Sequence, residues 1–303
     1  MPDVSANLRG IRCLLIATTC LALNDACNKH LVATLPVAEV VLLRALISGL
    51  IVFMVIAARG ELSALRALMR PDIMLRSLAE SWIGPLLIIA LAFMYQADVT
   101  AIYMVAPVFV ALVGFGHFKE KFNWPILIAG LIALGGAWLF IKPSSGVFQA
   151  VALLPIAAAT CQILREVISR TRGKRAEGGV PVSNRVILLS TVLFSILAAG
   201  VLAAFFPWAT PATIWRWPDA SEWFFLITAS ALFYLGVTYS YEAYRNSDLS
   251  VVAPFRYWYL LVAILAGIFA FGEVPGVQSI LGMIVIVGAG GIVLWHQRAQ
   301  SKS

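Results

Sequence analysis

Charged residues are scarce in this chain of 303 residues. Asp, Glu, Lys and Arg make up only 12% of it, whereas hydrophobic residues make up 61% and the mean hydropathy is +0.91. An ordinary soluble domain is roughly a quarter charged. So little charge cannot cover a water-facing surface, which excludes most cytosolic enzymes. The composition predicts a polytopic helical membrane protein, and the net charge of +7 is no sign of a nucleic-acid partner.

Residues for reactive chemistry are also few. The four cysteines form no CxxC pair and fall in apolar stretches, so we expect small buried residues. They are Cys13, Cys20, Cys27 and Cys161. The three histidines lie at the ends of apolar stretches, and no GxxxxGK[ST], HExxH or GxSxG motif occurs. We therefore predict no enzyme, no metal and no cofactor.

Long apolar runs are what the sequence does contain. A helix needs about 20 apolar residues to cross a bilayer, and ten stretches approach that length. They are 11–31, 36–58, 73–94, 98–117, 124–141, 147–169, 183–205, 222–243, 249–271 and 276–296. The first run continues past Asn24 and Asp25, which argues against a signal peptide. We predict an all-α protein with ten transmembrane helices.

The distribution of Lys and Arg predicts the orientation in the membrane. If the N-terminus is cytoplasmic, sixteen Lys and Arg residues fall in cytoplasmic segments. Only Lys29, Lys142 and Arg216 fall on the outer side. Cytoplasmic loops of membrane proteins carry this excess of positive charge. Both termini and the loop 170–184 are therefore expected to be cytoplasmic.

The chain also repeats itself. Residues 92–120 align with residues 245–273, and both copies end at a glutamate that precedes a Gly-rich apolar span. Each half, 1–145 and 146–303, then holds five helices. Because five is odd, the second half is inserted upside down relative to the first. Inverted repeats of this kind are typical of secondary transporters, whose central substrate cavity lies between the repeats.

These motifs resemble a known family. The features are Pro107 followed by Glu120 in PVFVALVGFGHFKE, VVAPF and FGE in the second half, and PVAEVVLLRALISG after the first stretch. Together they resemble the EamA-type ten-helix exporters of the drug/metabolite transporter superfamily. Aromatic residues in the second half are similar to those of aromatic amino acid exporters. The resemblance implies export of small metabolites across the bacterial inner membrane. His117-Phe118-Lys119 departs from the usual apolar-Gly pattern.

Ionisable residues within the apolar runs are candidates for gates. At about 1.5 Å rise per residue, Asp25 and Arg44 lie at matched depth in the outer half of the membrane. Glu80 and Arg256 are matched in the inner half and belong to opposite repeats. We expect two ion pairs, Asp25–Arg44 and Glu80–Arg256, which either gate the cavity or only stabilise the fold.

Polar and aromatic residues near these charges are candidates for substrate contact. Asn24 and Asn28 form a polar stripe at i, i+4, and Gln162 occupies the corresponding part of the second repeat. The remaining candidates are Trp82, Tyr103, Thr238, Tyr241 and Trp258. Packing against other helices is the alternative role for each.

The function predicted from the sequence is secondary export of amino acids, aromatic ones included, or of related metabolites. Broad-spectrum drug efflux is an alternative within the same class, because an aromatic cavity serves either substrate. A membrane-embedded enzyme is the weaker alternative. The expected partners are a small-molecule substrate and the bilayer, for a monomer or weak homodimer. Whether protons drive transport stays open.

Overall fold

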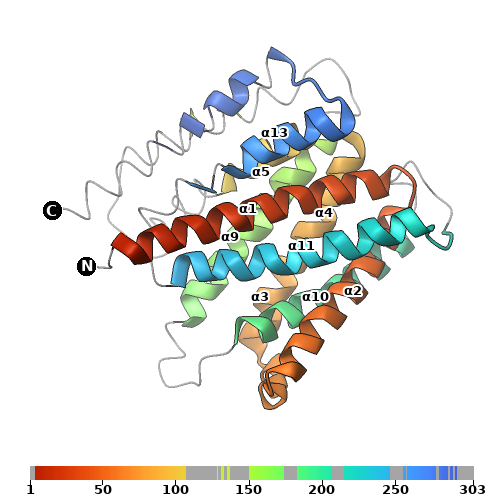
Figure 1. Cartoon of the computed structure of the whole chain (residues 1–303), viewed down its shortest axis with the longest axis vertical. Helices are drawn as coiled ribbons and strands as arrows, with labels where there is room; N and C mark the ends of the chain where they lie inside the picture. Colours follow the sequence, from red (N-terminus) through yellow and green to blue (C-terminus); the bar gives the residue numbers. More distant parts are fainter. Residues whose placement is uncertain are drawn as a thin grey trace.

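A computed structural model describes the chain in segments (Figure 1). They comprise residues 4–106, 128, 131–132, 135–136, 150–173, 183–205, 215–245, 255–256, 258–277, 280–285, 287–288 and 291. Every element named in these segments is helical: α1 (Val4–Val32), α2 (Val37–Ala58), the 3-10 helix η1 (Leu62–Met69), α3 (Pro71–Ser81), α4 (Ile83–Phe93), α5 (Gln96–Tyr103), α9 (Leu153–Gly173), α10 (Asn184–Phe205), α11 (Ala220–Arg245) and α13 (Trp258–Phe271). The predicted all-α fold is confirmed.

Five helices in the described segments are long and apolar enough to cross a membrane. They span Leu8–Val32, Val37–Ala58, Pro71–Phe93, Asn184–Ala204 and Ala220–Ala243. Each matches a predicted stretch. Most of the predicted stretches 98–117 and 124–141 and about half of 276–296 lie outside the described residues, as does Glu120, so the count of ten rests on the sequence.

The Pro71–Phe93 span is interrupted in its middle. Helix α3 ends at Ser81, and α4 begins at Ile83. Pro85 explains the interruption, since its ring has no N–H to bond the carbonyl of Ser81 and clashes with that carbonyl in a continuous helix. The break turns Ser81 and Gly84 toward the centre of the molecule, where both line a cavity.

Helices from the two ends of the chain pack against one another. Helix α1 has its most extensive contacts with α11 and also packs on α13, while α2 packs on α10 and both α3 and α4 pack on α9 (Figure 1). A glycine permits the closest of these approaches. A Cβ atom on Gly236 of α11 would lie 2.8 Å from Cγ of Leu21 on α1. Small residues at such positions let helix backbones approach closely.

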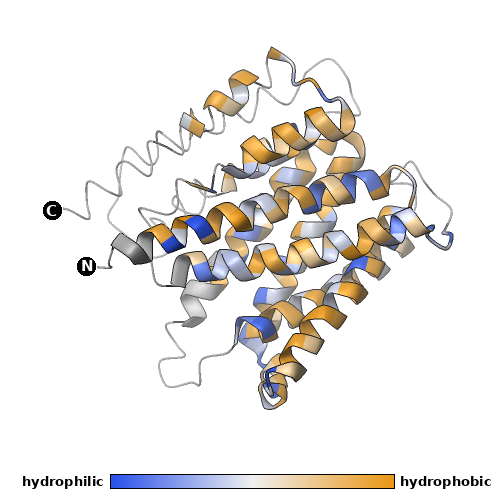
Figure 2. Ribbon diagram, viewed as in Figure 1, coloured by the Kyte–Doolittle hydropathy of each residue, from blue (hydrophilic) through white to orange (hydrophobic). Residues whose placement is uncertain are grey.

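Apolar side chains also cover the outside of the bundle. Figure 2 shows helices that are mostly hydrophobic along their length, with hydrophilic positions concentrated at few places, among them parts of α1. Large apolar residues such as Leu50, Phe53 and Leu197 are exposed. Because a polytopic protein exposes such residues to lipid, this surface agrees with a multi-pass membrane protein.

Candidate functional site: a polar cavity between the helices

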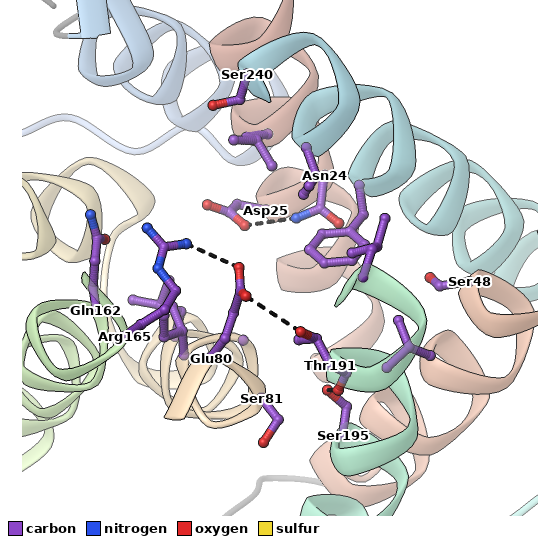
Figure 3. A pocket seen from close by; sticks show the side chains of 18 of the residues that line it. Asn24, Asp25, Ser48, Glu80, Ser81, Gln162, Arg165, Thr191, Ser195 and Ser240 are labelled. Carbon is purple, nitrogen blue, oxygen red and sulfur yellow. Dashed lines mark hydrogen bonds and ion pairs between the residues drawn. The ribbon is translucent and has the colours of Figure 1, made fainter. Parts of the chain in front are cut away.

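A cavity of about 630 Å³ lies at the centre of the bundle. Its walls come from α1 to α5 and from α9, α10, α11 and α13. Figure 3 shows polar side chains that point into it from several helices, including Asn24, Asp25, Glu80 and Gln162. Small-molecule sites have volumes of roughly 300–1,000 Å³, with a few polar groups that orient the ligand. The cavity has the size and character of such a site.

Asp25 is held in the cavity wall by two hydrogen bonds. The amide of Asn24 donates to its Oδ1 atom at 2.9 Å (Figure 3), and the hydroxyl of Tyr259 on α13 donates to Oδ2. An ionised carboxylate has about four acceptor positions, so Asp25 keeps capacity for a further donor. This is a direct polar contact between α1 and α13.

Arg44 faces Asp25 from α2 without touching it. The two side chains attract each other electrostatically but form no direct ion pair. The guanidinium lies 5.2 Å from the ring centroid of Phe233 on α11, a distance suited to a cation–π contact. The expected Asp25–Arg44 pair is thus brought into one cavity but is separated.

Glu80 has a different partner from the one predicted. Its carboxylate bonds Nη1 of Arg165 at 3.0 Å and the hydroxyl of Thr191 at 3.3 Å (Figure 3). It also bonds Nη1 of Arg76 at 3.2 Å. The expected Glu80–Arg256 ion pair was wrong. Depth in the membrane does not identify lateral neighbours: α3 packs on α9, which carries Arg165, whereas α13 packs on α1 and α5.

Three buried amides of the cavity wall have polar atoms without a hydrogen-bond partner among the described residues. Asn28 is 0% exposed, and within the described segments neither its Oδ1 nor its Nδ2 atom has a partner. The Oδ1 of Asn24 and the Oε1 of Gln162 also lack partners. All three residues line the cavity. Since an unpaired buried polar atom costs free energy, these atoms are suited to a bound polar molecule or to water.

Most of the residues chosen from the sequence line this cavity. They are Asn24, Asp25, Asn28, Arg44, Glu80, Tyr103, Gln162, Tyr241 and Arg256. Trp82, Thr238 and Trp258 are not among the lining residues. Trp82 packs against the apolar cluster around α2, and the indole of Trp258 donates to Thr19 at 3.0 Å.

Helix register explains why Thr238 and Trp258, two residues of the second half, were predicted to line the cavity but do not. On α11 the lining residues are Phe233, Val237, Ser240 and Tyr241, spaced as one helical face. Thr238 follows Val237 by one residue, which rotates it by about 100° about the helix axis, away from this face, whereas the predicted Tyr241 lies on it. On α13, Tyr259 and not Trp258 points to the cavity.

The sequence interpretation missed several small polar residues of the wall. They are Ser48, Ser81, Thr191, Ser195 and Ser240. The i, i+4 spacing of Thr191 and Ser195 in an apolar stretch was the available signal. Arg165, which lies near the inner end of its predicted helix, was also missed.

The cavity stops at Asn28, next to a buried ion pair. Lys29 bonds the carboxylate of Glu273, which follows α13, and also donates to the carbonyl oxygen of Met94 at 2.5 Å. The backbone N–H of Gln96 donates to Glu273 Oε2 at 2.9 Å. Glu273 is only 6% exposed. We call this side of the molecule the Glu273 end, where α1, α4, α5 and the segment after α13 meet.

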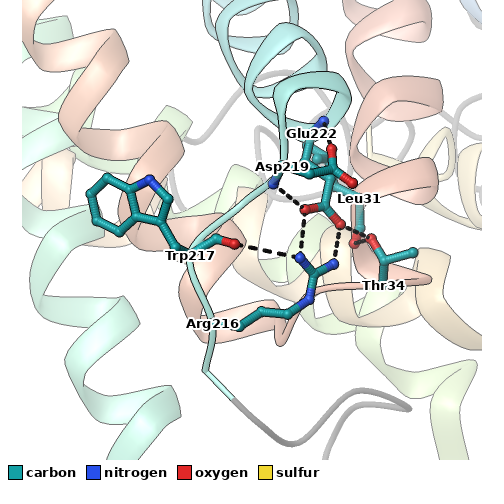
Figure 4. A network of polar contacts seen from close by, with 6 residues as sticks. All are labelled: Leu31, Thr34, Arg216, Trp217, Asp219 and Glu222. Carbon is teal, nitrogen blue, oxygen red and sulfur yellow. Dashed lines mark hydrogen bonds and ion pairs between the residues drawn. The ribbon is translucent and has the colours of Figure 1, made fainter.

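A second network closes the same end (Figure 4). Glu222, near the start of α11, binds the guanidinium of Arg216 through both carboxylate oxygens and accepts from Thr34 at 2.6 Å. Asp219 and Glu222 cap each other's backbone N–H groups, each at 2.8 Å, as in a capping box. The segment after α1 is thereby fixed to the start of α11.

The opposite side has a polar network of its own. Here Glu61, after α2, accepts from Nη1 of Arg185 at 2.5 Å and from the hydroxyl of Ser183 at 3.3 Å. The hydrogen bond from Arg185 lowers the pKa of Glu61. We call this the Glu61 end. Asn184, the first residue of α10, lines the cavity, so the cavity reaches this end.

Within the described residues, no three His, Cys, Asp or Glu side chains are grouped so that they could hold a metal ion.

The fold and the cavity define a polytopic membrane protein with a small-molecule site between its helices. Residues 8–142 match the EamA-like transporter family, the family that the sequence motifs resemble. The match covers the first of the two predicted halves.

Curated relatives resemble the chain over nearly its whole length. An S-adenosylmethionine uptake transporter of Rickettsia conorii (strain ATCC VR-613 / Malish 7) is 20% identical over 96% of this chain and 94% of that protein. The pseudopaline exporter CntI of Pseudomonas aeruginosa (strain UCBPP-PA14) is 23% identical over 92% of this chain and 94% of that protein. A solved structure titled "Crystal structure of protein" has a TM-score of 0.65 at 18% identity, covers 97% of this chain and 99% of that one, and supports the fold alone.

Proposed function

We propose that the protein is a secondary transporter that exports amino acids or related small metabolites across the bacterial inner membrane. The observation that carries this proposal is the central cavity, whose wall holds buried amide atoms without a hydrogen-bond partner in the part of the chain that the structure describes. Four aromatic rings in that wall suit amphipathic solutes, aromatic amino acids included. They belong to Tyr103, Phe233, Tyr241 and Tyr259.

Transport would proceed by alternating access between two halves, 1–145 and 146–303, related as inverted repeats. The Lys29–Glu273 pair joins these halves at the Glu273 end, and the cavity reaches the other end. Charge distribution supports a cytoplasmic Glu61 end, which is near Arg59, Arg66 and Arg70. The arrangement then corresponds to an inward-facing state that takes its substrate from the cytoplasm.

The relatives support a transporter of small metabolites. They do not indicate the direction of transport, since one is named for uptake and the other for export. Their names also give no support to a membrane-embedded enzyme. Broad-spectrum drug efflux is the second candidate, because the aromatic rings and Asp25 would suit an amphipathic cation. The arginines of the wall oppose it.

Flux in proteoliposomes tests the proposal. Counterflow of labelled amino acids and of cationic drugs is measured with the wild-type protein, with and without a pH gradient. We expect saturable amino acid counterflow that Asp25→Asn abolishes at equal reconstitution. Counterflow of drugs alone would replace the proposal with the second candidate. Impermeant thiol labelling of a cysteine in the loop 170–184 tests the orientation: labelling in intact cells would contradict a cytoplasmic Glu61 end.

A further inference from the structure

The charged residues of the cavity wall indicate a narrower class of substrate than amino acids in general. This inference rests on the proposed transport function. The described wall holds four arginines and two acids, namely Arg44, Arg76, Arg165, Arg256, Asp25 and Glu80. Glu80 is already bound by Arg76 and Arg165. Three charged groups then remain to meet a ligand: Asp25, Arg44 and Arg256.

Asp25 and Arg44 have the arrangement that an α-amino acid needs. Both side chains line the cavity and form no direct ion pair with each other, so a substrate in the cavity can contact both at once. Its ammonium group would donate to Asp25 and to the unpartnered Oδ1 of Asn24. Its α-carboxylate would accept from Arg44, in charge-assisted hydrogen bonds.

Arg256 is left over in this arrangement. It lines the same cavity within electrostatic range of the hydroxyls of Tyr103 and Tyr259, and it forms no ion pair with any described residue. A guanidinium stays charged even where it is partly removed from water. A charge at membrane depth without a partner is costly, and such groups usually meet a substrate or another charge.

We propose that the substrate carries two carboxylates and one ammonium group, with a net charge of −1, and that Arg256 binds the second carboxylate. The cavity volume leaves room for an additional apolar or aromatic group beside the rings of Phe233 and Tyr241. Amino-dicarboxylates, and dipeptides that contain one and keep a free α-amino group, have this chemistry. A neutral amino acid has no second carboxylate to neutralise the charge of Arg256. A cationic drug would bring a further positive charge beside it.

Binding to the purified full-length protein tests this assignment with matched ligand pairs. The pairs are L-glutamate with L-glutamine, and L-aspartyl-L-phenylalanine with L-asparaginyl-L-phenylalanine. Each pair differs only by a carboxylate or an amide. Because a hydrogen bond to a charged group is worth more than a neutral one, we expect about a tenfold or greater preference for the dicarboxylate in at least one pair. Equal affinities within both pairs would overturn the assignment.

Variants then locate the second carboxylate. Arg256→Gln should reduce the preference to about twofold or less while the amide ligand binds as before, and Arg256→Lys should retain most of it. Arg70→Gln, an arginine paired with Asp72 outside the cavity, is the control and should change nothing. A preference that survives in Arg256→Gln would contradict the role of this residue. The wild-type comparison needs no variant, so it decides the substrate class even if Arg256→Gln does not fold.

The two proposals fail in different ways. Binding and counterflow of neutral amino acids without preference for a dicarboxylate would leave amino acid transport standing and remove only the narrower class. Absence of binding and counterflow for every amino acid and dipeptide would remove both.

Discussion

Tyr259 donates its hydroxyl hydrogen to Asp25 inside the cavity, and this bond connects α13 to α1. The two residues are far apart in sequence and come from different predicted halves. Asp25 therefore depends on the second half for its orientation. Any movement of α13 relative to α1 would change how Asp25 is presented to a substrate.

Removing that bond should weaken substrate binding. For Tyr259→Phe we expect about tenfold or greater loss of affinity, because a hydrogen bond to a charged group contributes roughly 1.5–3 kcal/mol. Equilibrium binding to the purified protein measures the loss. Trp258→Phe changes the neighbouring aromatic residue, whose indole bonds Thr19 away from the cavity, and should bind normally. Equal losses in both variants would mean that packing of α13, and not the contact to Asp25, is responsible.

The Lys29–Glu273 pair should hold the Glu273 end closed. Glu273→Gln is expected to increase labelling of an Asn28→Cys variant by an impermeant maleimide added from that side, in a background in which the native cysteines are replaced. Asn28 is the cavity residue next to Lys29, so it reports on this closure. Reversing both charges, in Lys29→Glu with Glu273→Lys, should restore protection. Unchanged labelling in a folded Glu273→Gln protein would refute the closure.

Gly267→Ala offers a second test of the same closure without a change of charge. A Cβ atom at this position would lie 2.7 Å from Oε2 of Glu273, so the carboxylate has to move. We expect labelling of Asn28→Cys to rise as in Glu273→Gln, though to a smaller extent. Labelling as low as in the parent would show that Glu273 adjusts without loss of the ion pair.

Gly236→Ala should destabilise the protein. Its Cβ atom would lie 2.8 Å from Cγ of Leu21 and 3.2 Å from the backbone oxygen of Ala17. Overpacking of this kind costs about 1–3 kcal/mol, which thermal unfolding in detergent detects as a lower Tm. Gly200→Ala on α10 is the matched control, since nothing lies within 4 Å of its Cβ position. Its Tm should stay the same or rise, because alanine is the better helix former. Equal Tm changes in the two variants would argue against close α1–α11 packing.

The Glu61–Arg185 bond should make part of the stability pH-dependent. The pKa of Glu61 is lowered by Arg185 in the folded protein, so this contribution is complete above the unfolded pKa of about 4.3. It is lost as the pH falls through the lower, folded pKa. Wild type should therefore have a higher Tm than Glu61→Gln at pH 7, and the difference should narrow below about pH 4. A difference independent of pH would assign the effect to packing.

Much of the fold was predictable because apolar run length and charge placement are properties of single segments. The helices α2, α10 and α11 match their predicted stretches closely. Three of the six residues of α1 that line the cavity were also found, since Asn24, Asp25 and Asn28 stand out in an apolar helix. Such polar positions can be identified without knowing which helices lie beside them.

Lateral neighbours were not predictable in the same way. Membrane depth pairs Glu80 with Arg256, but α3 packs on α9 and α10, and so Arg165 of α9 is the partner from another helix. Rotation of a helix about its axis is equally hidden, which is why Thr238 and Trp258 were chosen in place of Ser240 and Tyr259. A single sequence fixes where a residue lies along a helix far better than which helix it faces.

The contact between α1 and α11 also bears on how the protein is made. During synthesis α1 leaves the ribosome first, and α11 follows about 190 residues later, which corresponds to roughly 10–40 s at common rates of translation. Until then, Asn24, Asp25 and Asn28 lack the surroundings that they have in the finished bundle. The insertion machinery or the polar headgroup region must therefore keep these polar residues of the nascent first helix out of the hydrocarbon core. The final structure forms only after nearly the entire chain has entered the membrane.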